Sequence, residues 1–221
     1  MKKIIKFTLF LKLGIIFLGN GMEVDAIKDY PDPPKSIPLT GIFQVPEGAD
    51  SYVEGNNVVI TDNTIRQVGS IFSEEGNKIY LEEDFESEMY VYLDGIADGI
   101  TFVMHNDPDA VLKFNGNTGG GLGIYSNMAR LDGKQLKKSF AVEFDTYFNG
   151  GLSISGDYFD SKVLANSNRG HVAYTFPDDQ NSYTSQKYQA VITHQGLQYP
   201  TFRLGDGTWR LFKMNWKTWD E

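Results

Sequence analysis

Short runs of β-branched and aromatic residues, separated by turns rich in Gly, Asn and Asp, make up most of the chain after residue 36. Such runs are typical of β-strands, and strict alternation marks a strand with one face on a core. The alternation is clearest in Phe85–Asp94, where Phe85, Ser87, Met89, Val91 and Leu93 share one face. Further strands are expected at Val58–Ile60, Val68–Phe72, Ile79–Leu81, Ile100–Met104, Leu122–Tyr125, Phe140–Thr146, Val172–Phe176, Tyr188–Thr193 and Trp209–Trp216.

The pattern contains no convincing amphipathic helix and no internal repeat. Many short strands joined by long, Gly-rich connections predict an all-β fold of two packed sheets, a sandwich of the jelly-roll kind. Two connections, His105–Thr118 and Asn149–Gly170, exceed ordinary hairpin length. Long connections on such sandwiches commonly carry function, so these two are candidate site loops.

The first 26 residues have the pattern of a secretory signal peptide. A Lys-rich start precedes an apolar stretch, Phe7–Leu18, and Val24-Asp25-Ala26 supplies a small-x-small cleavage pattern. The apolar stretch is too short for a comfortable membrane span, although an uncleaved anchor is the alternative. We therefore expect a secreted or cell-surface protein without a membrane span after cleavage. Residues 27–36 are rich in Pro and charge and predict an extended arm, which leaves 37–221 as one domain.

Charge and cysteine content narrow the possible partners. The 221-residue chain has a net charge of −9 and contains no Cys. An acidic chain is a poor ligand for phosphate backbones, which argues against nucleic acid as a partner. A secreted domain without disulfides depends on core burial, and a bound metal can add to its stability.

The segment Ser139–Asn149 is the most informative part of the chain. As a strand it presents Glu143 and Asp145 on one face and three apolar residues on the other. Two residues of rise put the two carboxylates about 6.6 Å apart at the backbone. The strand then runs into an oxygen-rich turn that ends at Asn149. Oxygen ligands of this kind suit a hard cation such as calcium.

Four motifs in order extend this picture. They are Ala97-Asp98-Gly99, the glycine run Thr118–Gly123, the strand Glu143–Asn149, and Gly170-His171-Val172-Ala173. Together they closely resemble the L-type (legume-type) lectins, in particular the lectin-like domains of surface proteins from Gram-positive bacteria. The resemblance runs from Ile37 to Trp216 and implies a concanavalin-like jelly roll that binds sugar and is supported by calcium.

By this resemblance, calcium is held by the Asp145 carboxylate, the Tyr147 backbone carbonyl and the Asn149 side chain. A further Asp belongs to the set, and either Asp157 or Asp160 fills that position, because the intervening loop is longer than in the plant proteins. Oxygen ligands are those that calcium prefers.

The resemblance also implies a transition-metal site for an ion such as manganese. Glu143 and His171 match its ligands, and Asp145 bridges the two ions. A mixed carboxylate and imidazole set agrees with such an ion. The other histidines, His105 and His194, have no partner spacing that suggests a site.

The sugar site implied by the resemblance centres on Asp98, whose carboxylate accepts hydrogen bonds from vicinal hydroxyls. The family holds this Asp with a cis peptide, so we expect a cis Ala97–Asp98 bond. A backbone N–H of Gly120 or Gly121 donates to the same hydroxyls. Asn149 also contacts the sugar, and an aromatic side chain stacks on its ring; either Tyr147 or Phe148 fits that role.

Two alternatives compete with a lectin. Jelly-roll hydrolases of the family-16 type carry Glu-x-Asp-x-x-Glu on one strand, but Phe148 stands where the second Glu belongs. Retaining hydrolysis needs two carboxyl groups, so the motif disfavours catalysis. The other alternative is a structural adhesin module with a decayed sugar site. It is suggested by the end of the chain, Trp216–Glu221, because lectins of this family continue through at least one more strand. We therefore expect a non-catalytic, calcium-supported glycan-binding module that lacks its last strand.

Overall fold

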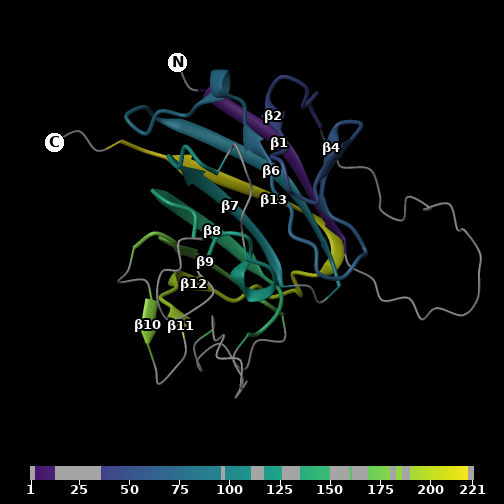
Figure 1. Cartoon of the computed structure of the whole chain (residues 1–221), viewed down its shortest axis with the longest axis vertical. Helices are drawn as coiled ribbons and strands as arrows, with labels where there is room; N and C mark the ends of the chain where they lie inside the picture. Colours follow the sequence, from purple (N-terminus) through teal and green to yellow (C-terminus); the bar gives the residue numbers. More distant parts are fainter. Residues whose placement is uncertain are drawn as a thin grey trace, which may run out of the picture.

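The computed structural model describes residues 3–12, 36–95, 98–110, 117–125, 135–149, 160, 169–179, 183–185 and 190–218. Two main sheets pack as layers (Figure 1). The first has the order β13-β6-β1-β4-β3 and the second the order β12-β9-β8-β7. Within the described ranges, no helix is long and apolar enough to cross a membrane.

The strands of the first sheet are β1 (Lys3–Lys12), β3 (Tyr52–Glu54), β4 (Asn57–Thr61), β6 (Phe85–Asp94) and β13 (Asp206–Trp216). Those of the second are β7 (Gly99–His105), β8 (Ser139–Asp145), β9 (His171–Thr175) and β12 (Gln195–Gln198). Two small ribbons pair β2 (Phe43–Gln44) with β5 (Phe72–Ser73) and β10 (Tyr183–Ser185) with β11 (Ala190–Ile192). Two 3₁₀ turns, η1 (Glu75–Asn77) and η2 (Gly119–Gly121), complete the elements.

The core lies between the two sheets and confirms the predicted sandwich. Phe212 of β13 contacts Phe144 of β8 edge-on, with ring centroids 5.2 Å apart. It also meets Phe102 of β7 at 5.5 Å. Buried residues of β4 and β6, among them Val58 and Met89, belong to the same cluster. Because the aromatic rings come from opposite sheets, burial of their faces holds the two layers together.

The N-terminal strand β1 pairs in parallel, unlike the other strand pairs among the described residues. It runs parallel to both neighbours and pairs with β6 in a register from Lys3↔Phe85 to Lys12↔Asp94. On its other side it pairs with β4. This strand falls within the predicted leader, whose cleavage stays a prediction. The predicted arm, residues 27–36, lies outside the described residues except for Ser36.

The alternation predicted for β6 is confirmed, because every residue of the predicted apolar face is buried. Three strand predictions were wrong. Val68–Phe72 is a strand only at Phe72, where the short strand β5 begins. Ile79–Leu81 is not a strand: Leu81 is exposed, and its carbonyl accepts a hydrogen bond from the Trp216 indole instead of a sheet neighbour. Leu122–Tyr125 forms turns, because Leu122 takes a left-handed conformation with φ of 46° directly after the glycines of η2.

That turn covers the second face of β8. Ile124 and Tyr125 are buried there with Leu136 and Ala141, in a smaller cluster separate from the core between the sheets. As a result both faces of β8 are covered, and its carboxylate face is more deeply buried than its aromatic face. Glu143 and Asp145 are therefore not solvated surface acids.

Gly170 is the point at which the chain enters β9 beside Asp145. Its φ is +82°, and a Cβ at this position would lie 2.3 Å from the Asp145 carbonyl oxygen. Gly55 also has a positive φ, +61°, but open space surrounds it. Comparison of these two glycines separates backbone strain from the close approach.

Gly170→Ala is expected to destabilise the fold more than Gly55→Ala. Both substitutions incur the left-handed strain of about 1–2 kcal/mol. Gly170→Ala adds an overpacking cost of about 1–3 kcal/mol because backbone atoms must move. Urea unfolding of the two variants and the parent measures this difference. Equal losses of unfolding free energy would show that the close approach at Gly170 has no cost.

Candidate functional site

The candidate site lies where β8 ends and β9 begins. The antiparallel register places Asp145 opposite His171 on one side and opposite Gly99 on the other. Asp98 precedes that glycine, and its carbonyl accepts a hydrogen bond of 2.9 Å from the Thr146 N–H. Sheet pairing therefore brings three of the four sequence motifs to one end of the second sheet.

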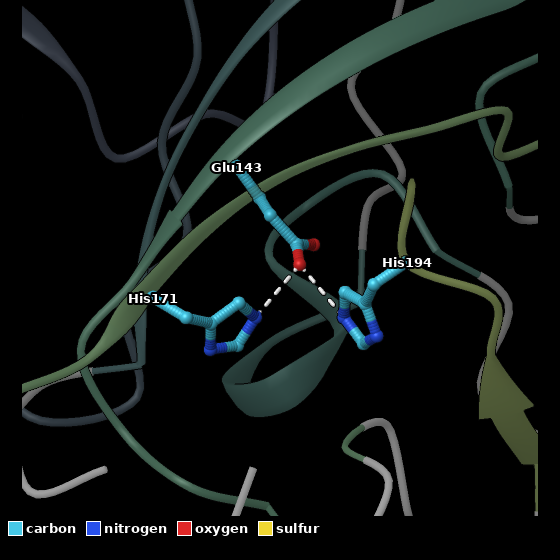
Figure 2. A group of neighbouring side chains, drawn as sticks. All are labelled: Glu143, His171 and His194. Atoms are coloured by element: carbon cyan, nitrogen blue, oxygen red, sulfur yellow. Dashed lines mark hydrogen bonds and ion pairs between the residues drawn. The ribbon is translucent and has the colours of Figure 1, made fainter. Parts of the chain in front are cut away.

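Glu143 is the centre of a buried cluster. Its Oε1 lies 2.9 Å from His171 Nε2 and 2.7 Å from His194 Nε2 (Figure 2). Its Oε2 accepts a hydrogen bond of 2.5 Å from the Tyr125 hydroxyl. That hydroxyl lies 2.7 Å from the Thr175 hydroxyl. Both carboxylate oxygens therefore have polar partners within the protein. These partners replace water, because the side chain is only 1% exposed.

The histidines keep Glu143 ionised. Burial alone would raise the pKa of the Glu143 carboxyl, but hydrogen bonds from His171 and His194, and the charges of these rings, lower the pKa to about 2. A buried carboxylate is stable only when such partners replace the water that it has lost.

Two further carboxylates are compensated less fully, because only Asp160 lies near the histidines, at 3.8 and 3.9 Å. Burial raises the pKa of Asp145 well above its ordinary value, and the neighbouring Asp160 and Glu143 carboxylates add to the effect. Burial also raises the pKa of Asp160. Each accepts one backbone hydrogen bond: Asp145 Oδ1 from the Tyr147 N–H at 2.7 Å, and Asp160 Oδ2 from the Asn149 N–H at 2.5 Å. A cation bound between these acids would supply the missing positive charge.

Asn149 connects this acidic cluster to Asp98. Its Nδ2 donates a hydrogen bond of 3.1 Å to Asp98 Oδ1. Its Oδ1 is buried and has no hydrogen-bond partner among the described residues, and the same holds for Asp160 Oδ1. Two buried orphan oxygens beside Asp145 fit the oxygen ligands of a calcium ion. The residues present therefore suit the predicted calcium.

The glycine turn lies beside Asp98. A Cβ added to Gly119 would lie 3.8 Å from Asp98 Oδ2, so η2 carries the predicted Gly120 and Gly121 next to this carboxylate. Gly121 itself is buried against Asn117. Tyr147 is 48% exposed at the start of the loop after β8.

The other predicted site residues are placed as follows. Phe148 is half-buried and follows Tyr147 in that loop. Asp160 lies in the cluster, within a group with Asp145 and His171 whose ligand atoms are all within 4.8 Å of one another. Asp157, and Ala97 of the predicted cis bond, lie outside the described residues.

His194 corrects the sequence analysis, which assigned no site to it. It precedes β12, whose pairing with β9 brings His194 to Glu143 from a distant part of the chain. Tyr125 was also missed, because the pattern assigned it to a strand. Neither residue could be assigned from local sequence spacing. Tyr125 reaches Glu143 through a turn that packs on the second sheet, and His194 through the pairing of β12 with β9.

Comparisons with known proteins agree with this geometry. The family model described as the legume lectin beta-barrel domain matches residues 36–220. The match contains every described residue of the candidate site and confirms the resemblance predicted from the motifs. No significant match to the chain is found among curated proteins or among solved structures.

Tyr125→Phe is expected to destabilise the protein by about 1.5–3 kcal/mol, the range for a hydrogen bond to a charged group. The change removes only the hydroxyl that donates to Glu143. Tyr174→Phe removes a hydroxyl from a more exposed tyrosine of β9 and is expected to change stability by less than about 0.5 kcal/mol. Urea unfolding of both variants checks this, and similar small losses would contradict a role for Tyr125 in holding Glu143.

Proposed function

This chain belongs to the L-type (legume) lectin domain family, and on that premise we propose that it is a secreted, calcium-supported glycan-binding module. Its role is adhesion to glycans or glycoconjugates, without catalysis. The family supports the carbohydrate-binding role. The calcium dependence is supported by the side chain of Asn149. Its amide nitrogen donates a hydrogen bond to Asp98, while its amide oxygen has no hydrogen-bond partner among the described residues.

Sugar is bound at Asp98 in this proposal. The carboxylate accepts hydrogen bonds from two vicinal hydroxyls, and charge-assisted bonds of this kind are the stronger ones. Asn149 Nδ2 orients the carboxylate by donating to Oδ1. The neighbouring glycine turn lets a backbone N–H approach the same hydroxyls closely. Tyr147, the more exposed of the two candidate aromatics, stacks on the apolar face of the sugar ring.

A bound calcium ion would hold Asn149, and through it Asp98, in position. Asp145, Asp160, the Asn149 Oδ1 and the Tyr147 carbonyl hold the ion, which supplies positive charge to a cluster of buried carboxylates. When Oδ1 of Asn149 is held, the opposite end of the amide is held toward Asp98. Bound calcium would therefore order the sugar site through Asn149.

Catalysis is disfavoured by the state of Glu143. A hydrolase of the type considered above would use this residue, yet Glu143 is 1% exposed and both of its oxygens are engaged by Tyr125 and the two histidines. Phe148 replaces the second carboxylic acid that the motif requires. The secreted location rests on the predicted leader of residues 1–26.

Removal of calcium is expected to abolish glycan binding. A glycan array probed with the protein in calcium-replete buffer should show binding that a chelator removes and that added calcium restores. The same protein should release no reducing ends from β-glucans. An array without binding in calcium, or binding that survives chelation, would each count against the proposed function.

Asp98→Ala is expected to lose glycan binding by at least about 100-fold while the fold persists, because buried polar groups of the sugar site are left unpaired. Asp109→Ala is the matched control. It also removes a carboxylate, but its side chain is largely exposed in the turn that follows His105, at the other end of β7 from Gly99. Binding by Asp98→Ala at the level of Asp109→Ala would show that the sugar site lies elsewhere.

A further inference from the structure

We propose that His194 is a direct metal ligand, and that Glu143, His171 and His194 form a centre selective for a borderline transition ion such as Zn²⁺. This centre lies next to the oxygen-rich calcium site at Asp145 and Asn149. The inference goes beyond the proposed function, because it concerns the identity of a second ion and its ligands rather than the recognition of sugar.

The three side chains converge on one point. Both Nε2 atoms are directed at the same carboxylate oxygen, Glu143 Oε1, from opposite sides (Figure 2). The two rings meet nearly at right angles, with an interplanar angle of 87° and centroids 5.0 Å apart. Stacked rings would direct both nitrogens along nearly parallel lines, whereas these rings direct them at a shared oxygen. The three ligand atoms lie within 4.8 Å of one another.

Asp160 supplies the fourth ligand, so in this proposal its carboxylate bridges this centre and the calcium site. Its Oδ1 lies 3.8 Å from His171 Nε2 and 3.9 Å from His194 Nε2. The Asp160 residue is 3% exposed, and Oδ1 has no hydrogen-bond partner among the described residues. Ligand atoms in a tetrahedral zinc site are roughly 3.4 Å apart, given bonds of about 2.0–2.1 Å. The observed separations, from 2.7 to 3.9 Å, lie on both sides of that value.

Tyr125 assigns the roles of the two Glu143 oxygens. Its hydroxyl holds Oε2, which leaves Oε1 directed at the two imidazoles. Outer hydrogen bonds of this kind fix the orientation of a metal-binding carboxylate. Glu143 is therefore a one-oxygen ligand whose position is set before the ion binds.

The second imidazole determines the choice of ion. Imidazole ligands suit zinc, copper, iron and nickel, whereas carboxylate, carbonyl and water ligands suit calcium, magnesium and manganese. A single histidine among carboxylates is compatible with manganese. Two histidines with two carboxylates favour zinc, and three such ligands resemble the His₂Glu sets of known zinc sites. His194 therefore shifts the preference of this centre away from manganese.

The test compares metal binding by the full chain, His194→Asn and His105→Asn. His105 is the matched control because its Nδ1 accepts a hydrogen bond from the Asp107 N–H in another part of the second sheet. In saturating calcium, chelator competition should give the parent and His105→Asn a ratio of Zn²⁺ to Mn²⁺ affinity that exceeds the ratio for His194→Asp, because zinc binds more tightly than manganese at most such sites and only the ratio reports the second imidazole. His194→Asn should lose at least about 10–100-fold in Zn²⁺ affinity, the range seen even for outer partners of a ligand. His194→Asp, which restores an oxygen ligand, should bind Mn²⁺ better than His194→Asn does.

A direct count of imidazoles needs no variant. Cobalt-loaded parent protein should show two hyperfine-shifted exchangeable imidazole N–H signals by NMR, because a ring bound through Nε2 keeps its proton on Nδ1. One signal, unchanged Zn²⁺ affinity in His194→Asn, or the same ratio of Zn²⁺ to Mn²⁺ affinity in the parent and His194→Asp would each overturn the proposal. Because no sugar is present, a failure here leaves the glycan-array result untouched, and the reverse also holds.

Discussion

The burial of three carboxylates at the end of β8 is the constraint on which the rest of this structure depends. Glu143, Asp145 and Asp160 are each nearly inaccessible to water. Buried negative charge is unfavourable unless hydrogen bonds or cations offset it. Two histidines and a tyrosine compensate Glu143, whereas Asp145 and Asp160 each accept one backbone hydrogen bond and Asp160 lies farther from the same histidines. The ionised forms of these buried acids therefore depend on nearby positive charge.

The sheet supplies the precision that such a site needs. Because β8 pairs on both sides, its last residues cannot shift without breaking two registers at once. Gly99 and Gly170 permit the close approach of backbone on either side of Asp145. Asn149 then extends the order of the strand into the loop through its contact with Asp98. The rigid sheet thus holds the half-buried carboxylate of Asp98 in a fixed position.

The sequence was sufficient for the parts of the molecule that follow local periodicity. The alternation of β6 and β8, the pairing of Glu143 with His171 in one site, and the position of Asp98 beside a glycine turn all agree with the structure. Leu122–Tyr125 was predicted to be a strand because it contains apolar residues. These residues are apolar because the turn packs on one face of β8. His194 was missed because its role depends on the pairing of β12 with β9, and such tertiary contacts leave no spacing signal.

The position of β1 has a consequence for the order of events during biogenesis. Lys3–Lys12 lies between β6 and β4 in the first sheet, and the same residues fall within the predicted leader. The segment pairs along its whole length with β6 but only through Leu9–Leu11 with β4, and its removal would leave the facing edges of β6 and β4 open. The segment is thus the subject of a competition between processing and folding. Its outcome determines whether the first sheet is continuous or presents a gap into which another strand can insert.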